Sequence, residues 1–492
     1  MTEKKIRRGN MKRIAIIVSA AALAFSALAL TACGESEEPV TRYEITAALD
    51  AENMTVSAEM KVTYVNKSDA ELDSLYFHLY PNAYREGARF PAAADGDVGE
   101  VYPHGRDYGG IAVETVTLGG EACEWEVAGE DENVLIVRGL SLEPGAEASA
   151  EMKFTLDLPE ARSRFGHCDG YVNLGNWYPI ACVYEDGGWR TDPYSTYGDP
   201  FYSETADYRV TFTAPTGWET AGTGSVSAAV GGDVTTYTFE AENVRDLALC
   251  SSENFVCTEA AVGDVTVRFY GTQAQSGGLE VACDAVSTFS ELFGAYPYKT
   301  YSVAVTPFNE GGMEYPAFVY VSDDLGASMT DEAIIHETAH QWWYAAVGSD
   351  QINEPWLDEG LAEYSATLFY GENPDYGVSV SDRIADAMQS YVLFSDVYSE
   401  NENIGVMDRA LGEYSSSTEY AFHSYVKSEL MFDSLRHIIG DDAFFGALRS
   451  YYANYSGKTA DGACLIAEFE KSSGMGLVGY FQSWLSGAAD VR

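Results

Sequence analysis

The stretch AIIHETAHQWW, residues 333–343, carries two histidines four positions apart in a chain that has only seven histidines among 492 residues. In a helix, residues i and i+4 lie on the same face, so His336 and His340 can direct two imidazoles toward one point. Neutral imidazole binds zinc at about 2.0–2.1 Å. Glu337 lies about 100° further round such a helix, from where it can approach water on that ion. Two buried histidines in an ordinary core helix are the alternative interpretation.

The second decisive stretch is NEPWLDEGLAEYSATLFY, residues 353–370. A catalytic zinc site needs a third protein ligand and keeps one position open. Glu359 lies in the first turn of the helix predicted from Pro355 to Tyr370, and a helical hairpin would return it to the two histidines. Glu363 is one turn further and could accept the free ring N–H of a ligand histidine. A solvated helix carboxylate is the alternative for Glu363.

These residues together predict hydrolytic chemistry. The H-E-x-x-H pattern supplies two zinc ligands and a general base. Water on zinc has a pKa near 7, and Glu337 can take and return its proton. Hydrolysis of an amide or an ester is therefore the predicted reaction, and the pattern alone does not name the donor that stabilises the oxyanion.

The two stretches resemble a known family. H-E-T-A-H-Q-W-W, followed by W-L-D-E-G-L-A-E-Y with eighteen residues between His340 and Glu359, is similar to the aminopeptidase N-like zinc metallopeptidases, which are gluzincins. The resemblance covers roughly residues 45–490. It implies one zinc ion as cofactor, held by His336, His340 and Glu359, and peptides with a free N-terminus as substrates.

A second family motif, G-x-M-E-N, appears here as Gly311-Gly312-Met313-Glu314-Tyr315, with tyrosine in place of asparagine. The resemblance implies that Glu314 binds the α-amino group of the substrate. It also implies that Gly311, Gly312 and Met313 bind the peptide backbone. An exposed loop glutamate is the alternative for Glu314.

Two tyrosines complete the predicted site. Tyr425-Val426-Lys427-Ser428 resembles the family's Y-x-K-G helix start, with serine where glycine is usual, which implies that Tyr425 stabilises the oxyanion. Tyr420 resembles a second site tyrosine of a family member and is predicted to contact substrate. The chain has 34 tyrosines, so a purely structural role is the alternative for both. Asn173 or Asn176 is a further candidate to reach the site from the N-terminal domain.

The first 33 residues have the three regions of a signal peptide: a basic start, the apolar stretch IAIIVSAAALAFSALAL, and the ending LTAC. Residues 30–34 resemble a bacterial lipobox, which implies lipid attachment at Cys33. The protein would then be exported, lipid-anchored to the cell membrane and exposed outside the cytoplasm. The acidic residues 34–41 are predicted to be a tether. A plain transmembrane anchor or ordinary cleavage is the alternative.

Alternating apolar and polar residues, interrupted by turn residues, predict an antiparallel β-sandwich-like domain over residues 42–258. Residues 259–492 begin with strands and become mainly helical, which predicts a thermolysin-like α+β catalytic domain. Helices are expected at residues 279–293, 331–347, 355–370, 424–439 and 443–453.

The charge balance is strongly acidic: 29 basic against 76 acidic residues give a formal charge of −47. Nucleic acid is therefore excluded as a partner, because phosphate binding needs a basic surface. Apart from Cys33 there are seven cysteines, an odd number, whose spacing assigns no disulfide.

The sequence thus predicts an exported zinc aminopeptidase. The longer family members have a large C-terminal helical domain for which this sequence shows no counterpart, so the site is expected to be more open. A zinc endopeptidase or another hydrolase on the same scaffold is therefore one alternative. A non-catalytic surface lipoprotein that binds peptides or zinc is the other.

Overall fold

The computed structural model describes residues 39–275, 277–400, 403–489 and 491. The predicted signal peptide, the lipidation site Cys33 and most of the tether lie outside the described residues, so these predictions are not tested by the structure. Within the described part, no helix is long and apolar enough to cross a membrane. The seven cysteines in the described part are all unpaired.

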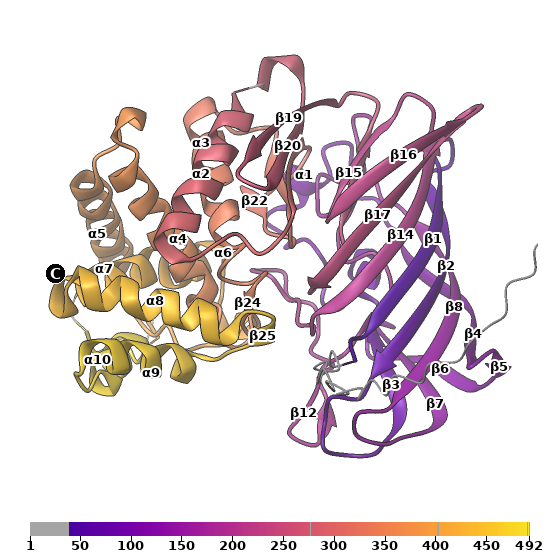
Figure 1. Cartoon of the computed structure of the whole chain (residues 1–492), viewed down its shortest axis with the longest axis horizontal. Coiled ribbons are helices and arrows are strands. Elements are labelled where there is room, and N and C mark those ends of the chain that lie inside the picture. The colour runs from indigo at the N-terminus through magenta and orange to yellow at the C-terminus, as the bar shows by residue number, and fades with distance from the viewer. Residues whose placement is uncertain (1–38, 276, 401–402, 490, 492) are drawn as a thin grey trace, which may run out of the picture. The chain divides into compact units, whose positions relative to one another are not determined.

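Residues 42–252, called the β half below, are built around an eight-stranded sheet in the order β16-β17-β14-β1-β2-β8-β4-β5 (Figure 1). Neighbouring strands are antiparallel, except that β1 and β14 run parallel. Exposed and buried residues alternate along β1, so one face of the sheet packs on the core. The strands are β1 (Arg42–Asp50), β2 (Thr55–Val65), β4 (Gly110–Leu118), β5 (Glu121–Ala122), β8 (Glu147–Asp157), β14 (Ala206–Pro215), β16 (Ser225–Gly231) and β17 (Val234–Val244).

Two four-stranded sheets, in the orders β15-β18-β10-β9 and β11-β3-β7-β6, share the hydrophobic core of the large sheet. Their strands are β3 (Leu72–His78), β6 (Glu124–Ala128), β7 (Val134–Leu142), β9 (Phe165–Cys168), β10 (Tyr171–Leu174), β11 (Ile180–Ala181), β15 (Glu219–Gly222) and β18 (Leu249–Ser252). A small hairpin, β12 (Tyr184–Glu185) with β13 (Gly188–Trp189), and the short helices η1 (Tyr80–Tyr84) and α1 (Val98–Val101) complete this half. This architecture confirms the predicted β-sandwich-like domain.

Residues 256–489, called the helical half below, begin with a mixed five-stranded sheet in the order β19-β20-β21-β23-β22. Strands β20, β21 and β23 are parallel, and β22 is an antiparallel edge strand. The strands are β19 (Val256–Val262), β20 (Val265–Gly271), β21 (Thr300–Thr306), β22 (Gly312–Met313) and β23 (Phe318–Ser322). The change of sheet falls between β18 and β19, a few residues before the predicted domain boundary at 258/259.

The rest of this half is mainly helical, as predicted. Its helices are η2 (Gln273–Gln275), α2 (Gly278–Phe293), α3 (Ala327–Ala339), α4 (Trp356–Glu372), η3 (Pro374–Tyr376), α5 (Val380–Val397), η4 (Leu411–Glu413), α6 (Ser417–Ala421), η5 (Phe422–Lys427), α7 (Ser428–Ile439), α8 (Asp441–Tyr455), α9 (Gly462–Ser473) and α10 (Val478–Leu485). A two-stranded ladder joins β24 (Val347–Gly348) to β25 (Lys458–Thr459). Strands followed by helices confirm the α+β interpretation.

The prediction that one helix spans residues 331–347 is wrong at both ends. Helix α3 covers Ala327–Ala339, and beyond it the backbone widens into i→i−5 bonds such as Ala345 N–H to the His340 carbonyl. Tyr344 then adopts φ 130°, which turns the chain into β24. This turn is fully buried, so its apolar residues look in sequence like the continuation of a core helix.

Arg245, which follows β17, ties the β half to this buried turn. Its guanidinium is buried and donates to the carbonyl oxygens of Tyr344, at 2.9 Å, and Ser203, at 3.1 Å. A Cβ atom at Gly348 would lie 1.9 Å from the guanidinium carbon, so only glycine allows this approach. The segment that follows α3 is therefore held in place by a side chain of the β half.

Candidate metal centre and active site

The three predicted metal ligands meet at one point between α3 and α4. His336 lies on α3, His340 directly follows it, and Glu359 is in the first turn of α4. The His336 and His340 Nε2 atoms are 3.1 Å apart. Glu359 Oε2 lies 3.3 Å from the former and 3.2 Å from the latter. All three side chains are buried.

This spacing fits a zinc ion. Ligands that surround zinc tetrahedrally at 2.0–2.1 Å are about 3.3–3.4 Å from one another, close to the distances observed between these three atoms. The outer ring nitrogens are also held: His336 Nδ1 lies 3.0 Å from Glu363 Oε2, and His340 Nδ1 lies 3.0 Å from the Trp343 carbonyl oxygen. Each imidazole can thus carry its proton on Nδ1 and present Nε2 to the metal.

Glu337 lies beside the ligand set and is itself buried. Within the described part of the chain, its Oε2 atom has no hydrogen-bond partner. Burial, followed by repulsion from Glu314, raises the pKa of Glu337 to about 8 despite the opposing effect of the two histidines. A Cβ atom at Gly312 would lie 2.3 Å from Glu337 Oε1, so the glycine allows edge strand β22 to approach the carboxylate.

Glu314 comes directly after β22 and is buried next to this group. Its Oε1 atom accepts a hydrogen bond of 2.7 Å from Gln351 Nε2. One ligand atom each from Glu314, Glu337 and His340 lie within 4.8 Å of one another. The carboxylate predicted to bind the substrate amine is therefore beside the metal ligands and is not an exposed loop residue.

The other residues of this motif have different surroundings. Gly311 and Gly312 line the cavity over the metal ligands, whereas Met313 is fully buried in the core of the β half. Met313 can therefore reach a substrate only through its backbone. Tyr315, which replaces the motif's asparagine, is also buried, and its hydroxyl donates to Asn176 Oδ1 at 3.2 Å.

Both predicted tyrosines donate to the Oε1 atom of Glu359, Tyr420 at 3.0 Å and Tyr425 through a shorter hydrogen bond. Tyr425 lies in the π-helical turn η5, stacks on the His336 ring at 5.5 Å and lines the cavity. Burial, and then the Glu359 charge, raise the pKa of Tyr425 well above its ordinary value, so its hydroxyl stays a donor. Tyr420 is not among the described residues that line the cavity, and its hydroxyl contacts the predicted metal ligand Glu359. Its contact with substrate stays a prediction.

The cavity over these groups has a volume of about 250 Å³ and is partly open to solvent. Carboxylates dominate its lining, and among the described residues that line it there is no lysine or arginine. Its carboxylates belong to Asp199, Glu310, Glu314, Glu332, Glu337, Glu359 and Glu363. A divalent cation and a substrate ammonium group are ligands that this surface favours.

The β half contributes Asp199 to this cavity, a residue that belongs to no recognised sequence motif. Asn173 and Asn176, the predicted contributors, lie elsewhere: Asn173 donates to backbone carbonyls, including that of Pro307, and Asn176 donates to Asp246. Gln351, which holds Glu314, was also not predicted, because a single glutamine between two motifs carries no spacing signal.

Comparison with known proteins places this site in a family. Residues 278–484 match the peptidase family M1 domain. The chain is 26% identical over 225 residues to an aminopeptidase N of Streptomyces lividans, covering 42% of this chain and 26% of that protein. It is 21% identical over 282 residues to human aminopeptidase O, covering 49% and 34%. The chain thus spans about a quarter to a third of the length of these relatives.

A solved structure extends the likeness to both halves. The M1 zinc metallopeptidase of Deinococcus radiodurans superimposes with a TM-score of 0.65 at 17% identity, over 92% of this chain and 94% of that one. The chain shares the fold of this metallopeptidase. Residues 278–484, which contain the three predicted zinc ligands, match the M1 peptidase domain, and this match confirms the resemblance of the sequence to the aminopeptidase N-like family.

The ligand geometry predicts one high-affinity zinc site. We expect the metal-stripped protein to bind one equivalent of zinc, and Glu359→Ala to weaken binding by more than about 100-fold, because losing a ligand costs more than losing an outer partner. Competition with a chelator of known affinity measures this. Glu372→Ala, at the exposed end of the same helix, is the control. Unchanged affinity in Glu359→Ala would contradict the ligand assignment.

Proposed function

We propose that this protein is a zinc-dependent aminopeptidase that removes N-terminal residues from peptides. The observation that carries the proposal is the buried Glu314 carboxylate within 4.8 Å of ligand atoms of His340 and Glu337. A carboxylate at this distance from the reaction centre can bind a terminal ammonium group one residue away from the bond that is cut. The relatives named as aminopeptidases, and a structural neighbour described as bound to a Tyr-Ser-Ala substrate, support the same activity.

The predicted residues that line the cavity have separate tasks in this reaction. Zinc would supply Lewis acidity, which polarises the scissile carbonyl group and makes water more acidic. Glu337 accepts a proton from the attacking water and returns it to the leaving amine. Tyr425 donates its hydroxyl hydrogen to the developing oxyanion. Glu314 fixes the substrate amine, and the edge strand at Gly311 and Gly312 is open to backbone pairing with the peptide.

The proposal extends to location. Lipid attachment at Cys33, anchoring to the membrane and exposure outside the cytoplasm are supported by the sequence of residues 1–34 alone. The peptide substrates would then be extracellular.

The amine anchor is tested with paired substrates. Wild-type protein is expected to cleave free peptides and to spare their N-acetylated forms. Glu314→Gln retains a partner for Gln351 but loses the charge, so we expect cleavage of free peptides to fall about 10- to 100-fold, the value of a charged hydrogen bond. Zinc content should be unchanged. Equal cleavage of free and acetylated peptides would exclude an aminopeptidase, and internal cuts would indicate an endopeptidase.

The proton-transfer role of Glu337 predicts a separation of binding from turnover. Glu337→Gln should keep its zinc and lose about 10²- to 10⁴-fold in kcat on an aminoacyl reporter substrate. Glu291→Gln, on the exposed side of α2, is the control. A Glu337→Gln protein that turns over at the wild-type rate would show that another group moves the proton.

The close approach of β22 to Glu337 predicts a contrast between Gly312 and a glycine remote from the site. The new Cβ in Gly312→Ala would displace the Glu337 carboxylate, so we expect a loss of about 10²-fold in kcat with zinc content retained. Gly479→Ala, on the exposed side of α10, is the matched control, because nothing lies within 4 Å of its new Cβ. Equal activities of the two variants would contradict the proposed position of Glu337 during catalysis.

A further inference from the structure

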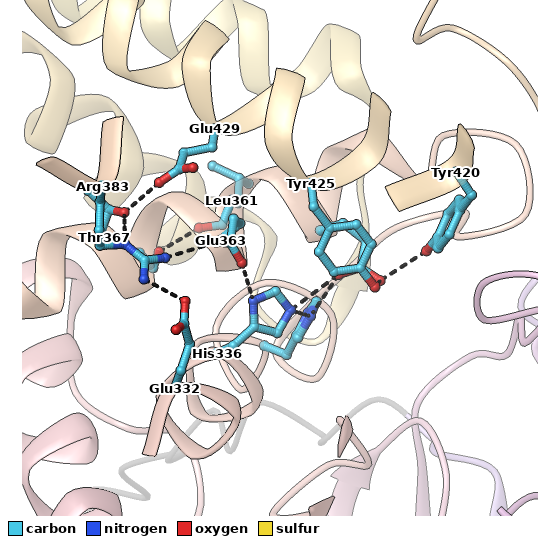
Figure 2. Close-up of polar contacts among 12 residues, drawn as sticks. Glu332, His336, Leu361, Glu363, Thr367, Arg383, Tyr420, Tyr425 and Glu429 are labelled. Carbon is cyan, nitrogen blue, oxygen red and sulfur yellow. Dashed lines mark hydrogen bonds and ion pairs between the residues drawn. The ribbon is translucent and has the colours of Figure 1, made fainter. Parts of the chain in front are cut away.

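Arg383 lies on α5, and in Figure 2 its guanidinium points toward Glu332, Glu363 and Thr367. Its side chain is 15% exposed. It donates from Nη2 to Glu363 Oε1 at 2.9 Å and from Nε to Thr367 Oγ1 at 2.8 Å. Nη1 makes a further ion pair with Glu332. Each of the three guanidinium nitrogens therefore has an acceptor.

The positions of these acceptors along their helices are informative. Glu332 lies on α3, one turn before His336. Glu363 lies on α4, one turn after Glu359, and Thr367 follows one turn later. Because residues four apart share a helix face, one guanidinium joins the ligand-bearing faces of both helices. The two histidines belong to α3 and its C-terminal end, and Glu359 belongs to α4. The distance between these helices therefore sets the distance between the imidazoles and the Glu359 carboxylate.

Glu363 connects this bridge directly to a metal ligand. Its two oxygens have different partners: Oε1 accepts from Arg383, and Oε2 faces His336 Nδ1 at 3.0 Å. With Oε1 held by a charged donor, the carboxylate has little freedom to rotate away from the ring. The orientation of His336 then depends on Arg383 through Glu363.

The network continues away from the metal. Thr367 Oγ1 accepts from Arg383 and donates to Glu429, a buried residue of α7 (Figure 2). Arg383 itself stacks over the Tyr370 ring at 5.2 Å. Arg383 thus joins α5 directly to α3 and α4, and Thr367 extends the network to α7. The planar fork of arginine is needed for the three contacts that Arg383 makes. A lysine carries the same charge but has a single ammonium group that cannot match three acceptors in one plane.

We propose that Arg383 is a positioning residue of the zinc centre. It holds Glu363 and the two ligand-bearing helices in the arrangement in which His336, His340 and Glu359 can share one ion. This inference rests on the zinc site of the proposed function. It differs from an ordinary stabilising ion pair in one respect: it predicts a loss of metal affinity beyond any loss of stability.

The test measures zinc affinity by chelator competition, together with thermal unfolding of the metal-free proteins. Outer partners of zinc ligands are typically worth 10- to 100-fold in affinity, so we expect Arg383→Met to bind zinc 10- to 100-fold more weakly. Arg383→Lys should show an intermediate loss. Arg436→Met is the matched control: Arg436 also sits on a helix of this half, pairs with Asp441 at 2.8 Å and stacks over Phe445. It should keep wild-type affinity.

A double substitution tests the route. If Arg383 acts through Glu363, Arg383→Met combined with Glu363→Gln should weaken zinc binding by less than the product of the separate effects. A folded Arg383→Met protein with wild-type zinc affinity would overturn the proposal. If Arg383→Met does not fold, the test relies on Arg383→Lys. Wild-type zinc affinity in Arg383→Lys would then overturn the proposal. A wild-type protein that binds no zinc would instead overturn the proposed function.

Discussion

The convergence of two imidazoles and one carboxylate in a buried space is the constraint on which the rest of the structure depends. Polar atoms brought this close without water are costly unless each has a defined partner. The structure meets this requirement on the outer side of every ligand: Glu363 for His336, a backbone carbonyl for His340, and two tyrosine hydroxyls for Glu359. The Nε2 atoms of the two histidines and the Oε2 atom of Glu359 face one another, and a cation bound between them would have all three as ligands.

The charges around the cavity follow the same logic. Seven carboxylates line it, and the described lining residues include neither lysine nor arginine. Two arginines that do not line the cavity pair with some of these carboxylates. Arg383 pairs with Glu363 and Glu332, and Arg164 of the β half lies 3.2 Å from Asp199 and 2.8 Å from Glu310. The inner carboxylates, Glu337 and Glu314, are thereby left for ligands that bring positive charge with them.

Much of this centre could be predicted from the sequence, because it is encoded by local spacing. The i, i+4 histidines, the glutamate at the next helix start and Glu363 one turn later are fixed by helix geometry once the helices are assigned. Tyr425 and Glu314 required a family resemblance, since each comes from a separate segment. Asp199, Gln351 and Arg383 carried no such signal: their positions depend on how distant segments pack. The predicted helix ran past Ala339 to residue 347 because the turn that follows is buried. Its apolar residues carry no polar signal that would mark the end of a helix.

Tyr315 makes a close contact between the two halves of the molecule. The position that is asparagine in the family motif holds a tyrosine whose hydroxyl occupies the space beside Gly175, where a Cβ atom would lie 1.8 Å from it. Neighbouring Tyr320 donates to the Leu249 carbonyl in the β half and accepts from the Leu174 N–H. A chimera that joined this peptidase domain to the β half of a relative would bring together surfaces that were not selected for each other. In such a chimera Tyr315 and Gly175 would have to be transferred together, because a larger residue at position 175 would collide with the tyrosine hydroxyl.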